Sequence, residues 1–219
     1  TMLAAQGATV AINYRDKAAR AQKVADAIIA DGGKAIVVGA DLTDYPSIDA
    51  LAETLKSEFG GLDLLVLNAS GGMETGKGED YAMKLNRDAQ VNLVNTLLPL
   101  LGAGSKIVFV TSHQAHFIRE VETMPEYVPV ALSKRAGEDA LRDMIPALTE
   151  KGIEGFLADW AKTGQKILAV NFDRLAASSG LPFPFRGMGA TDPAGAGLPP
   201  AGTGCAASHC VIAAVSAGV

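Results

Sequence analysis

Short apolar runs alternate with longer amphipathic stretches along the chain, and this alternation constrains the fold more than any other feature. The apolar runs are rich in Val, Ile and Leu, as strands buried on both faces of a parallel sheet are. The stretches between them have helical periodicity, so strands and helices take turns along the chain. We predict strands at 8–13, 35–39, 62–68, 106–111 and 153–158, and helices at 17–30, 47–59, 80–98 and 129–150. The pattern predicts an α/β fold, a doubly wound parallel sheet in a three-layer α/β/α arrangement.

The chain opens on the end of a helix rather than on a strand. Residues 3–7, Leu-Ala-Ala-Gln-Gly, are typical of a last helical turn closed by a glycine. In a sheet with right-handed crossovers, a strand precedes such a helix. We therefore expect the first strand of the sheet, and the loop after it, to be absent from this sequence.

The composition changes near the carboxyl end. Residues 174–219 hold three charged residues against eight glycines, five prolines and eleven alanines, which is typical of irregular chain. A short apolar segment follows at 211–215. We expect residues 1–173 to form one N-terminally incomplete domain and 174–219 to be an Ala/Gly/Pro-rich segment of uncertain order.

Composition also excludes several functional classes. A chain of 219 residues with 48% hydrophobic residues can bury one core, and its net charge of −5 argues against a nucleic-acid partner. No apolar run is long enough to span a membrane, and the first seven residues hold no basic segment and too short an apolar stretch for a signal peptide, so we predict a cytoplasmic protein. Its two cysteines, Cys205 and Cys210, give no disulfide framework, and with His209 they lack common zinc spacing, so no metal is predicted.

Four short motifs occur in order along the chain. They are Val-Ala-Ile-Asn-Tyr-Arg at 10–15, Gly-Ala-Asp-Leu-Thr-Asp at 39–44, Leu-Asn-Ala-Ser-Gly-Gly at 67–72 and Val-Ala-Leu-Ser-Lys-Arg-Ala-Gly at 130–137. Together they resemble the short-chain dehydrogenase/reductase family over residues 3 to about 153, nearest to bacterial members similar to the beta-ketoacyl carrier-protein reductases. The resemblance implies a Rossmann-like sheet and hydride transfer between NAD(P) and a carbonyl or alcohol.

The resemblance implies a cofactor site built from the first three motifs. The first lies where the family binds the adenosine ribose, and Arg15 in place of an acidic residue favours the 2′-phosphate of NADP(H), with NAD possible. In the family, the second motif contacts the edge of the adenine ring and the third motif packs along the cofactor. As alternatives, Arg15 pairs with Asp16 in solvent, and Asp41 caps a turn. The implied cofactor-binding residues are Asn13, Tyr14, Arg15, Asp41, Leu42, Asn68, Ala69, Ser70 and Lys134.

Three catalytic positions of the family find a counterpart here. Ser112 follows the strand at 106–111 and matches the serine that orients the substrate oxygen, while Lys134 matches the lysine that binds the nicotinamide ribose. Asn86, thirteen residues before Pro99, matches the helix asparagine that holds a water in the proton relay. Asn92 is a competing choice for that role, and a surface amide is the alternative for Asn86.

The family tyrosine is the position that departs from the pattern. The residue four before Lys134 is Val130, which has no proton to give, and the nearest phenol is Tyr127. Pro129 favours a helix start and biases Val128 towards an extended backbone, which leaves Tyr127 on the loop leading in. Tyr127 then serves either as the proton donor or as a lid or packing residue.

Two imidazoles next to Ser112 are further candidates. His113 and His116 could donate a proton near neutral pH or line the pocket.

The family's glycine fingerprint, Thr-Gly-x-x-x-Gly-x-Gly, is not found, and no glycine-rich substitute occurs before residue 71. Since that loop cradles the pyrophosphate, we expect this polypeptide alone to bind a dinucleotide weakly. Ala-Asp-Trp-Ala at 158–161 stands where the family has Pro-Gly, and a faint match to the family's last strand occurs at 163–170.

The sequence thus predicts an NADP-leaning oxidoreductase for a small carbonyl or alcohol, associating as a homodimer or homotetramer through the helices at 80–98 and 129–150. The alternative is a catalytically silent Rossmann-like sensor or scaffold that binds a cofactor or a partner.

Overall fold

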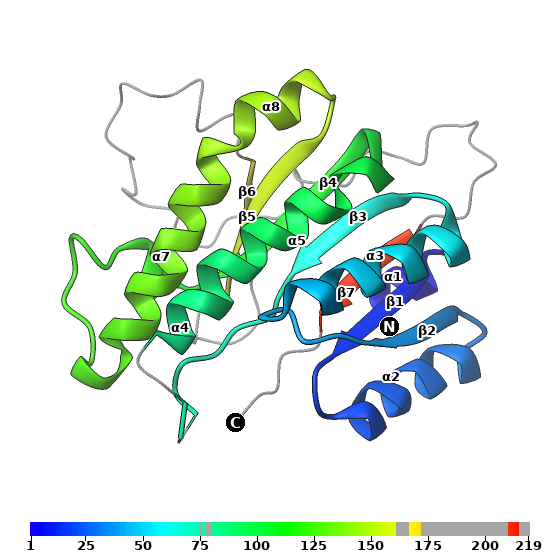
Figure 1. The fold of residues 1–219 in the computed structure, drawn as a ribbon, viewed down its shortest axis with the longest axis horizontal. Helices are drawn as coiled ribbons and strands as arrows, with labels where there is room; N and C mark the ends of the chain where they lie inside the picture. Colours follow the sequence, from blue (N-terminus) through cyan, green and yellow to red (C-terminus); the bar gives the residue numbers. More distant parts are fainter. Residues whose placement is uncertain (75, 78–79, 161–166, 172–209, 215–219) are drawn as a thin grey trace, which may run out of the picture.

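One seven-stranded sheet runs through the molecule (Figure 1). The computed structural model describes residues 1–74, 76–77, 80–160, 167–171 and 210–214. The strand order is β2-β1-β7-β3-β4-β5-β6, and every neighbouring pair is parallel except β5 and β6. This order confirms the predicted α/β, Rossmann-like parallel sheet. The strands are β1 Thr9–Tyr14, β2 Lys34–Gly39, β3 Leu62–Leu67, β4 Leu101–Thr111, β5 Glu154–Trp160, β6 Ile167–Asn171 and β7 Cys210–Ala214.

Helices cover both faces of the sheet, because successive side chains of a strand point to opposite sides. From β1, Val10 and Ile12 join a core with α1 (Met2–Ala5) and α2 (Ala18–Ala30). Ala11 joins the larger core on the other face, which α3, α5, α7 and α8 complete. The bounds of these helices are α3 Tyr45–Phe59, α5 Ala89–Leu97, α7 Val128–Asp143 and α8 Ile145–Glu150.

The position between β1 and β3 is filled by β7, which comes from the alanine- and glycine-rich segment. β7 is parallel to both neighbours, with Ala11 opposite Ile212 on one side and Leu65 opposite Ile212 on the other. In the doubly wound order 3-2-1-4-5-6 this is the place of the first strand. Strands β1 and β3 would otherwise each present unpaired N–H and C=O groups in the middle of the sheet. Residues 211–214 of the apolar segment predicted at 211–215, together with Cys210, therefore form a central strand.

The helix predicted at 80–98 is interrupted. It begins as α4 (Tyr81–Met83), passes through a π-helical turn, η1 (Lys84–Asp88), and continues as α5 into a 3₁₀ turn, η2 (Leu98–Leu100). A π turn accommodates one extra residue and is frequent at functional sites. The turn contains Asn86, the predicted relay residue.

The backbone leading into α7 differs from the prediction in one respect. Val128 was expected to be extended because it precedes Pro129, but it is helical, with φ −51° and ψ −48°. The 3₁₀ turn η3 (Pro125–Tyr127) runs directly into α7, so Val128 continues a helical path that has already begun. The steric preference of a residue before proline disfavours this conformation without forbidding it. The predicted helix 129–150 also divides, into α7 and α8.

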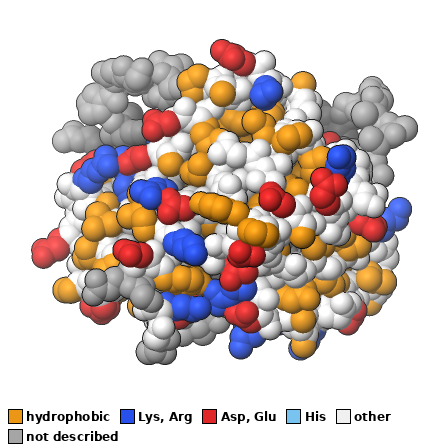
Figure 2. All heavy atoms as spheres, in the orientation of Figure 1, with side chains coloured by type: hydrophobic (Ala, Val, Ile, Leu, Met, Phe, Trp, Pro, Cys, Tyr) orange, Lys and Arg blue, Asp and Glu red, His pale blue; other side chains and the backbone are white. Residues whose placement is uncertain are grey.

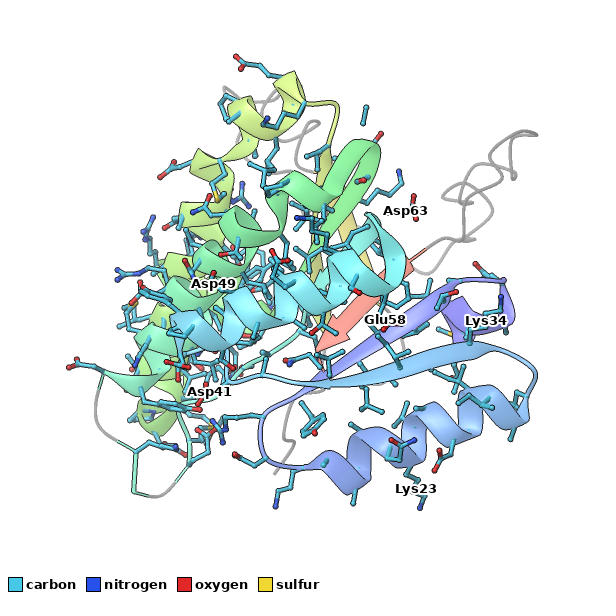
Figure 3. All side chains as sticks on the ribbon, turned by 45° about the vertical axis from the view of Figure 1, so that its right-hand side comes forward. Lys23, Lys34, Asp41, Asp49, Glu58 and Asp63 are labelled. Atoms are coloured by element: carbon cyan, nitrogen blue, oxygen red, sulfur yellow. The ribbon has the colours of Figure 1, made fainter. Side chains whose placement is uncertain are left out.

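The carboxyl ends of β1, β2, β3 and β4 meet at one edge of the sheet, as parallel strands require. Figure 3 shows Lys34 at the start of β2 and Asp41 just beyond its opposite end. Figure 2 shows acidic and basic side chains interspersed over the face it presents. Within the described residues, every helix is too short or too polar to cross a membrane.

Candidate active site

Ser112 lies just beyond β4 and is held by the helix that follows it. Its extended backbone, with φ −140° and ψ 151°, makes it the N-cap of α6 (His113–His116). Its Oγ accepts a hydrogen bond of 3.1 Å from the backbone N–H of Ala115. The cap fixes the direction of the hydroxyl at the carboxyl edge of the sheet, where doubly wound folds bind their ligands.

Tyr127 reaches this serine. Its phenolic O–H donates a hydrogen bond of 3.2 Å to Ser112 Oγ. Tyr127 is the last residue of η3 and the N-cap of α7, with φ −94° and ψ −14°, so it lies on the helical path into α7 and not on the predicted loop. Its contact with Ser112 is compatible with the predicted role of Tyr127 as proton donor.

Lys134 lies one α7 turn beyond Val130 and is only 8% exposed. Its Nζ donates to the backbone carbonyl of Val110, at 3.4 Å, near the end of the strand that leads to Ser112. Val130, which stands at the family tyrosine position, is buried and lies within reach of the turn at Gly72. Gly72 has a φ of +118°, and a Cβ there would collide with Ala82, so this turn requires glycine.

Asn86 is 1% exposed, which contradicts the surface-amide alternative. Its Nδ2 donates to the carbonyl of Gly71 at 2.8 Å and to Ser133 Oγ at 2.9 Å, while its Oδ1 accepts from the N–H of Gly71 at 3.1 Å. The side chain thus ties the segment after β3 to α7. Asn92 takes part in none of the described contacts of this site.

The closeness of α7 to η1 depends on Gly137. A Cβ at this position would overlap the carbonyl oxygen of Asn86 and touch Phe109. Without a side chain, α7 approaches the π turn closely enough for Ser133 to meet Asn86.

A pocket opens at the ends of β1 and β2, beside the segment after β3. Asn13 lines it, and its Nδ2 donates to the carbonyls of Val38 and Ala40, both at 3.2 Å. The lining residues include the predicted Asn13, Tyr14, Arg15, Asp41, Leu42, Ala69 and Ser70, together with Lys17, Arg20, Glu74 and Tyr81. Of the residues predicted in the first three motifs, only Asn68 does not line the pocket, although it is next to Ala69 in the sequence.

Arg15 and Asp41 face the pocket and also make the local contacts considered as alternatives. Arg15 Nε donates to Asp16 at 2.6 Å, which raises the pKa of the guanidinium, and its Nη1 donates to the phenol of Tyr81. Asp41 Oδ1 accepts from the N–H and the Oγ1 of Thr43, each at 2.8 Å. Burial raises the pKa of Asp41, but the bonds from Thr43 and the charges of Arg15 and Lys77 outweigh it, so the pKa is lowered.

Sequence analysis did not identify Tyr81 as a pocket residue. Its position in the first turn of a helix that starts at the carboxyl edge of the sheet could have indicated it. Burial raises the pKa of its phenol.

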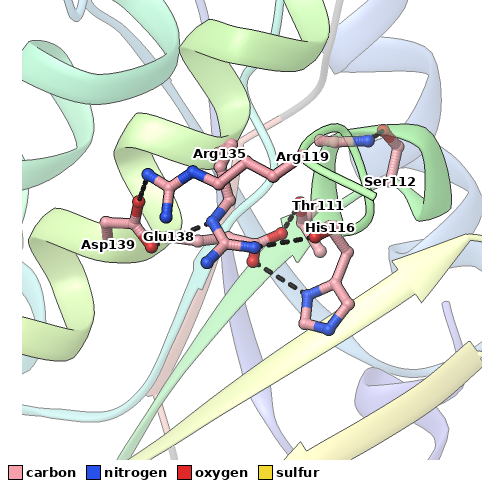
Figure 4. A network of polar contacts seen from close by, with 8 residues as sticks. Thr111, Ser112, His116, Arg119, Arg135, Glu138 and Asp139 are labelled. Atoms are coloured by element: carbon pink, nitrogen blue, oxygen red, sulfur yellow. Dashed lines mark hydrogen bonds and ion pairs between the residues drawn. The ribbon is translucent and has the colours of Figure 1, made fainter. Parts of the chain in front are cut away.

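Glu138 is the other residue that sequence reasoning missed. It is fully buried, and its carboxylate contacts Thr111 and His116 (Figure 4). Its position four residues after Lys134 places both on one face of α7, a spacing that could have indicated a shared role. His116 faces this carboxylate, whereas His113 is exposed and packs on Phe117 with ring centroids 4.8 Å apart.

No group of three or more metal-binding side chains is found within the described residues. Cys205 and His209 lie outside them.

Comparison with known proteins gives a consistent picture. The sequence model of the short chain dehydrogenase family matches residues 1–155. The chain is 34% identical over 158 residues to the hydroxynaphthalene reductase Arp2 of Aspergillus fumigatus, covering 68% of this chain and 55% of that protein. It is 38% identical over 117 residues to an uncharacterized oxidoreductase of Methylorubrum extorquens, covering 50% of this chain and 47% of that protein. The chain thus spans about half the length of the curated relatives it matches.

Solved structures of similar fold are short-chain dehydrogenases and reductases as well. A short chain dehydrogenase from Burkholderia cenocepacia in complex with NADP is 32% identical, with a TM-score of 0.60 over 69% of this chain and 63% of that one. The promiscuous reductase LugOII, which catalyses keto-reduction at C1 during lugdunomycin biosynthesis, is 26% identical, with a TM-score of 0.65 over 81% of this chain and 75% of that one.

Proposed function

The chain belongs to the short-chain dehydrogenase family, and from that premise we propose that it acts as an NADP(H)-dependent oxidoreductase that interconverts a small carbonyl compound and its alcohol. The observation that carries this proposal is the hydrogen bond from the Tyr127 phenol to Ser112 Oγ. It supplies a proton donor beside the serine even though Val130 occupies the family position. The silent-protein alternative rested on that valine and loses its main support.

The pocket at the ends of β1 and β2 fits the adenosine half of NADP(H). Arg15 supplies a cation for a 2′-phosphate, and Lys17 and Arg20 line the same pocket. Asp41 and Leu42 would meet the adenine, and Ala69 and Ser70 line the same pocket. The Burkholderia relative that was solved with NADP supports this assignment.

The residues around Ser112 then have distinct tasks. The bound cofactor supplies the hydride. Ser112 holds the substrate oxygen, and Tyr127 donates its phenolic proton to that oxygen as negative charge develops there. Lys134 binds the nicotinamide ribose from α7, and Asn86 holds a water that returns a proton to the site from solvent.

We also propose that residues 1–173 form the Rossmann-like domain, joined in its sheet by β7. By family resemblance, the protein associates as a homodimer or homotetramer through the helices at 80–98 and 129–150. A chain with only two cysteines suits the reducing cytoplasm.

Replacing Tyr127 with phenylalanine tests the proposed function. In the natural full-length protein, Tyr127→Phe should lower kcat by about 10²- to 10⁴-fold, the usual contribution of a general acid, without loss of NADPH binding. The measurement follows NADPH absorbance with a panel of small aldehydes and ketones.

Tyr45→Phe is the matched control, because Tyr45 is 58% exposed on α3, and it should leave kcat unchanged. Full turnover in Tyr127→Phe would overturn the assignment of Tyr127. Cofactor binding without turnover by the unaltered protein across the whole panel would favour the sensor alternative.

A further inference from the structure

Glu138 is a buried carboxylate that the proposed chemistry does not use. It is 0% exposed, on the face of α7 that packs against the end of β4. A carboxylate removed from water is stable only if donors surround it. Two donors are present: Thr111 Oγ1 donates to Glu138 Oε1 at 2.5 Å, and His116 Nδ1 lies 2.9 Å from Oε2 (Figure 4).

The carboxylate fixes the protonation of the imidazole. An ionised carboxylate can only accept hydrogen bonds, so the ring nitrogen of His116 that faces it must carry the hydrogen. Arg142 also faces Glu138: burial lowers the pKa of its guanidinium and the charge of Glu138 raises it.

Charged side chains at the surface also join α6 and the residues after it to α7. Arg135 Nη1 donates to the backbone carbonyl of His116 at 2.7 Å, and its Nε donates to Asp139 at 2.9 Å. Arg119 donates to the other oxygen of Asp139 at 2.7 Å. The carboxyl end of α6 is therefore held to α7 by its backbone as well as by its imidazole.

Thr111 and His116 bracket the segment that carries Ser112. Thr111 is the last residue of β4 and His116 the last of α6, with the Ser112 cap between them. Glu138 anchors both side chains to α7, the helix that also carries Lys134 one turn earlier. We infer that Glu138 is a positioning residue, which fixes Ser112 relative to Lys134 and Tyr127 through Thr111 and His116. This inference rests on the proposed function.

The first experiment measures turnover in the natural full-length protein. Glu138→Leu should lower kcat about 10- to 100-fold, the effect of a small misplacement of a catalytic group, with little change in the KM for NADPH. Glu138→Gln keeps the shape and one acceptor oxygen, so it should recover most of the lost kcat. Asp143→Asn removes an equal charge from an exposed site on the same helix and should change nothing. A folded Glu138→Leu with unchanged kcat would overturn the inference.

The second experiment does not depend on activity. Nitrogen-15 spectra of the imidazoles should show His116 protonated at Nδ1, and Glu138→Leu should shift the amide resonances of Ser112 and Ala115, whereas Asp143→Asn should not. Protonation of His116 at Nε2 alone contradicts the inference. These signals decide it even where no turnover is found, a result that would count against the proposed function instead.

Thr111→Val provides a second test of the positioning role if the Glu138→Leu variant does not fold. Valine keeps the β-branched shape of Thr111 and removes only its donor. It should lower kcat and shift the Ser112 amide, and unchanged values of both would reject the positioning role.

Discussion

The two ends of the site lie on one edge of one sheet but are built in opposite ways. At the β4 and α7 end, polar side chains are buried and bind partners far away in sequence: Asn86 meets Ser133 across 47 residues and Thr111 meets Glu138 across 27. At the β1 and β2 end, Asn13 and the bond from Arg15 to Tyr81 also join distant residues, but the charged groups are partly exposed and pair with close neighbours as well. Arg15 binds the adjacent Asp16, and Asp41 binds Thr43, two residues on.

This difference in burial indicates at which end of the site a substitution should change both stability and activity. A buried polar group that loses its partner costs about 1–3 kcal/mol, because water cannot replace the lost bond. A partly exposed pair costs far less, because solvent takes over. Substitutions at the β4 and α7 end should therefore change stability and turnover together, whereas those at the β1 and β2 end should change mainly ligand binding, with at most a small effect on stability.

The sharpest test of this contrast is Gly137→Ala. The new Cβ overlaps the carbonyl oxygen of Asn86, which belongs to backbone and cannot rotate away. Separation of α7 from η1 should lower the free energy of unfolding by about 1–3 kcal/mol, as overpacking does, and lower kcat with it. Urea denaturation and steady-state turnover measure the two effects.

Gly102→Ala is the matched control, because a Cβ at Gly102 meets nothing within 4 Å. It should leave both quantities near their original values. If Gly137→Ala changed stability but not turnover, the coupling claimed for this end of the site would be wrong.

The fold, and the edge of the sheet on which the site lies, could be predicted because both depend on local sequence patterns. Apolar runs of five to seven residues define the strands, and in a parallel sheet the residues that follow them share one edge. Ser112 and Asp41 were placed in this way, and the structure puts both at that edge.

The rest depends on contacts that no local pattern encodes. The apolar segment at 211–215 indicates a strand, but its place between β1 and β3 is decided by unpaired backbone groups far away in the chain. The π turn at Asn86 packs closely against Gly137 of a distant helix, and Glu138 resembles an ordinary helix-surface acid in the sequence, because its contact with Thr111 forms only in the fold. Tyr127 could be named as a candidate, but the fold of 113–126 decides whether it reaches Ser112.

At the other end, Arg15→Gln should affect binding without affecting folding. Loss of a charge-assisted bond of about 1.5 kcal/mol should weaken NADPH binding about tenfold and leave NADH binding unchanged, because only NADPH carries the 2′-phosphate. Fluorescence titration of both cofactors measures the ratio. Lys23→Gln removes an equal charge from exposed α2 and should not alter it. Equal weakening of NADPH and NADH would assign Arg15 to the fold rather than to phosphate recognition.

The smallest effect is expected from Asp41, and its sign follows from its pKa. Because the folded state lowers that pKa, the ionised carboxylate stabilises the fold above the unfolded value of about 3.9. This contribution is lost as pH falls through the lower folded value. Asp41→Asn should therefore lower the thermal midpoint slightly at neutral pH and leave it unchanged in strong acid. Asp49→Asn, at an exposed site on α3, should show no such convergence. An effect of Asp41→Asn as large as that of Gly137→Ala would remove the distinction between the two ends, because water would then fail to replace the bonds of a partly exposed carboxylate.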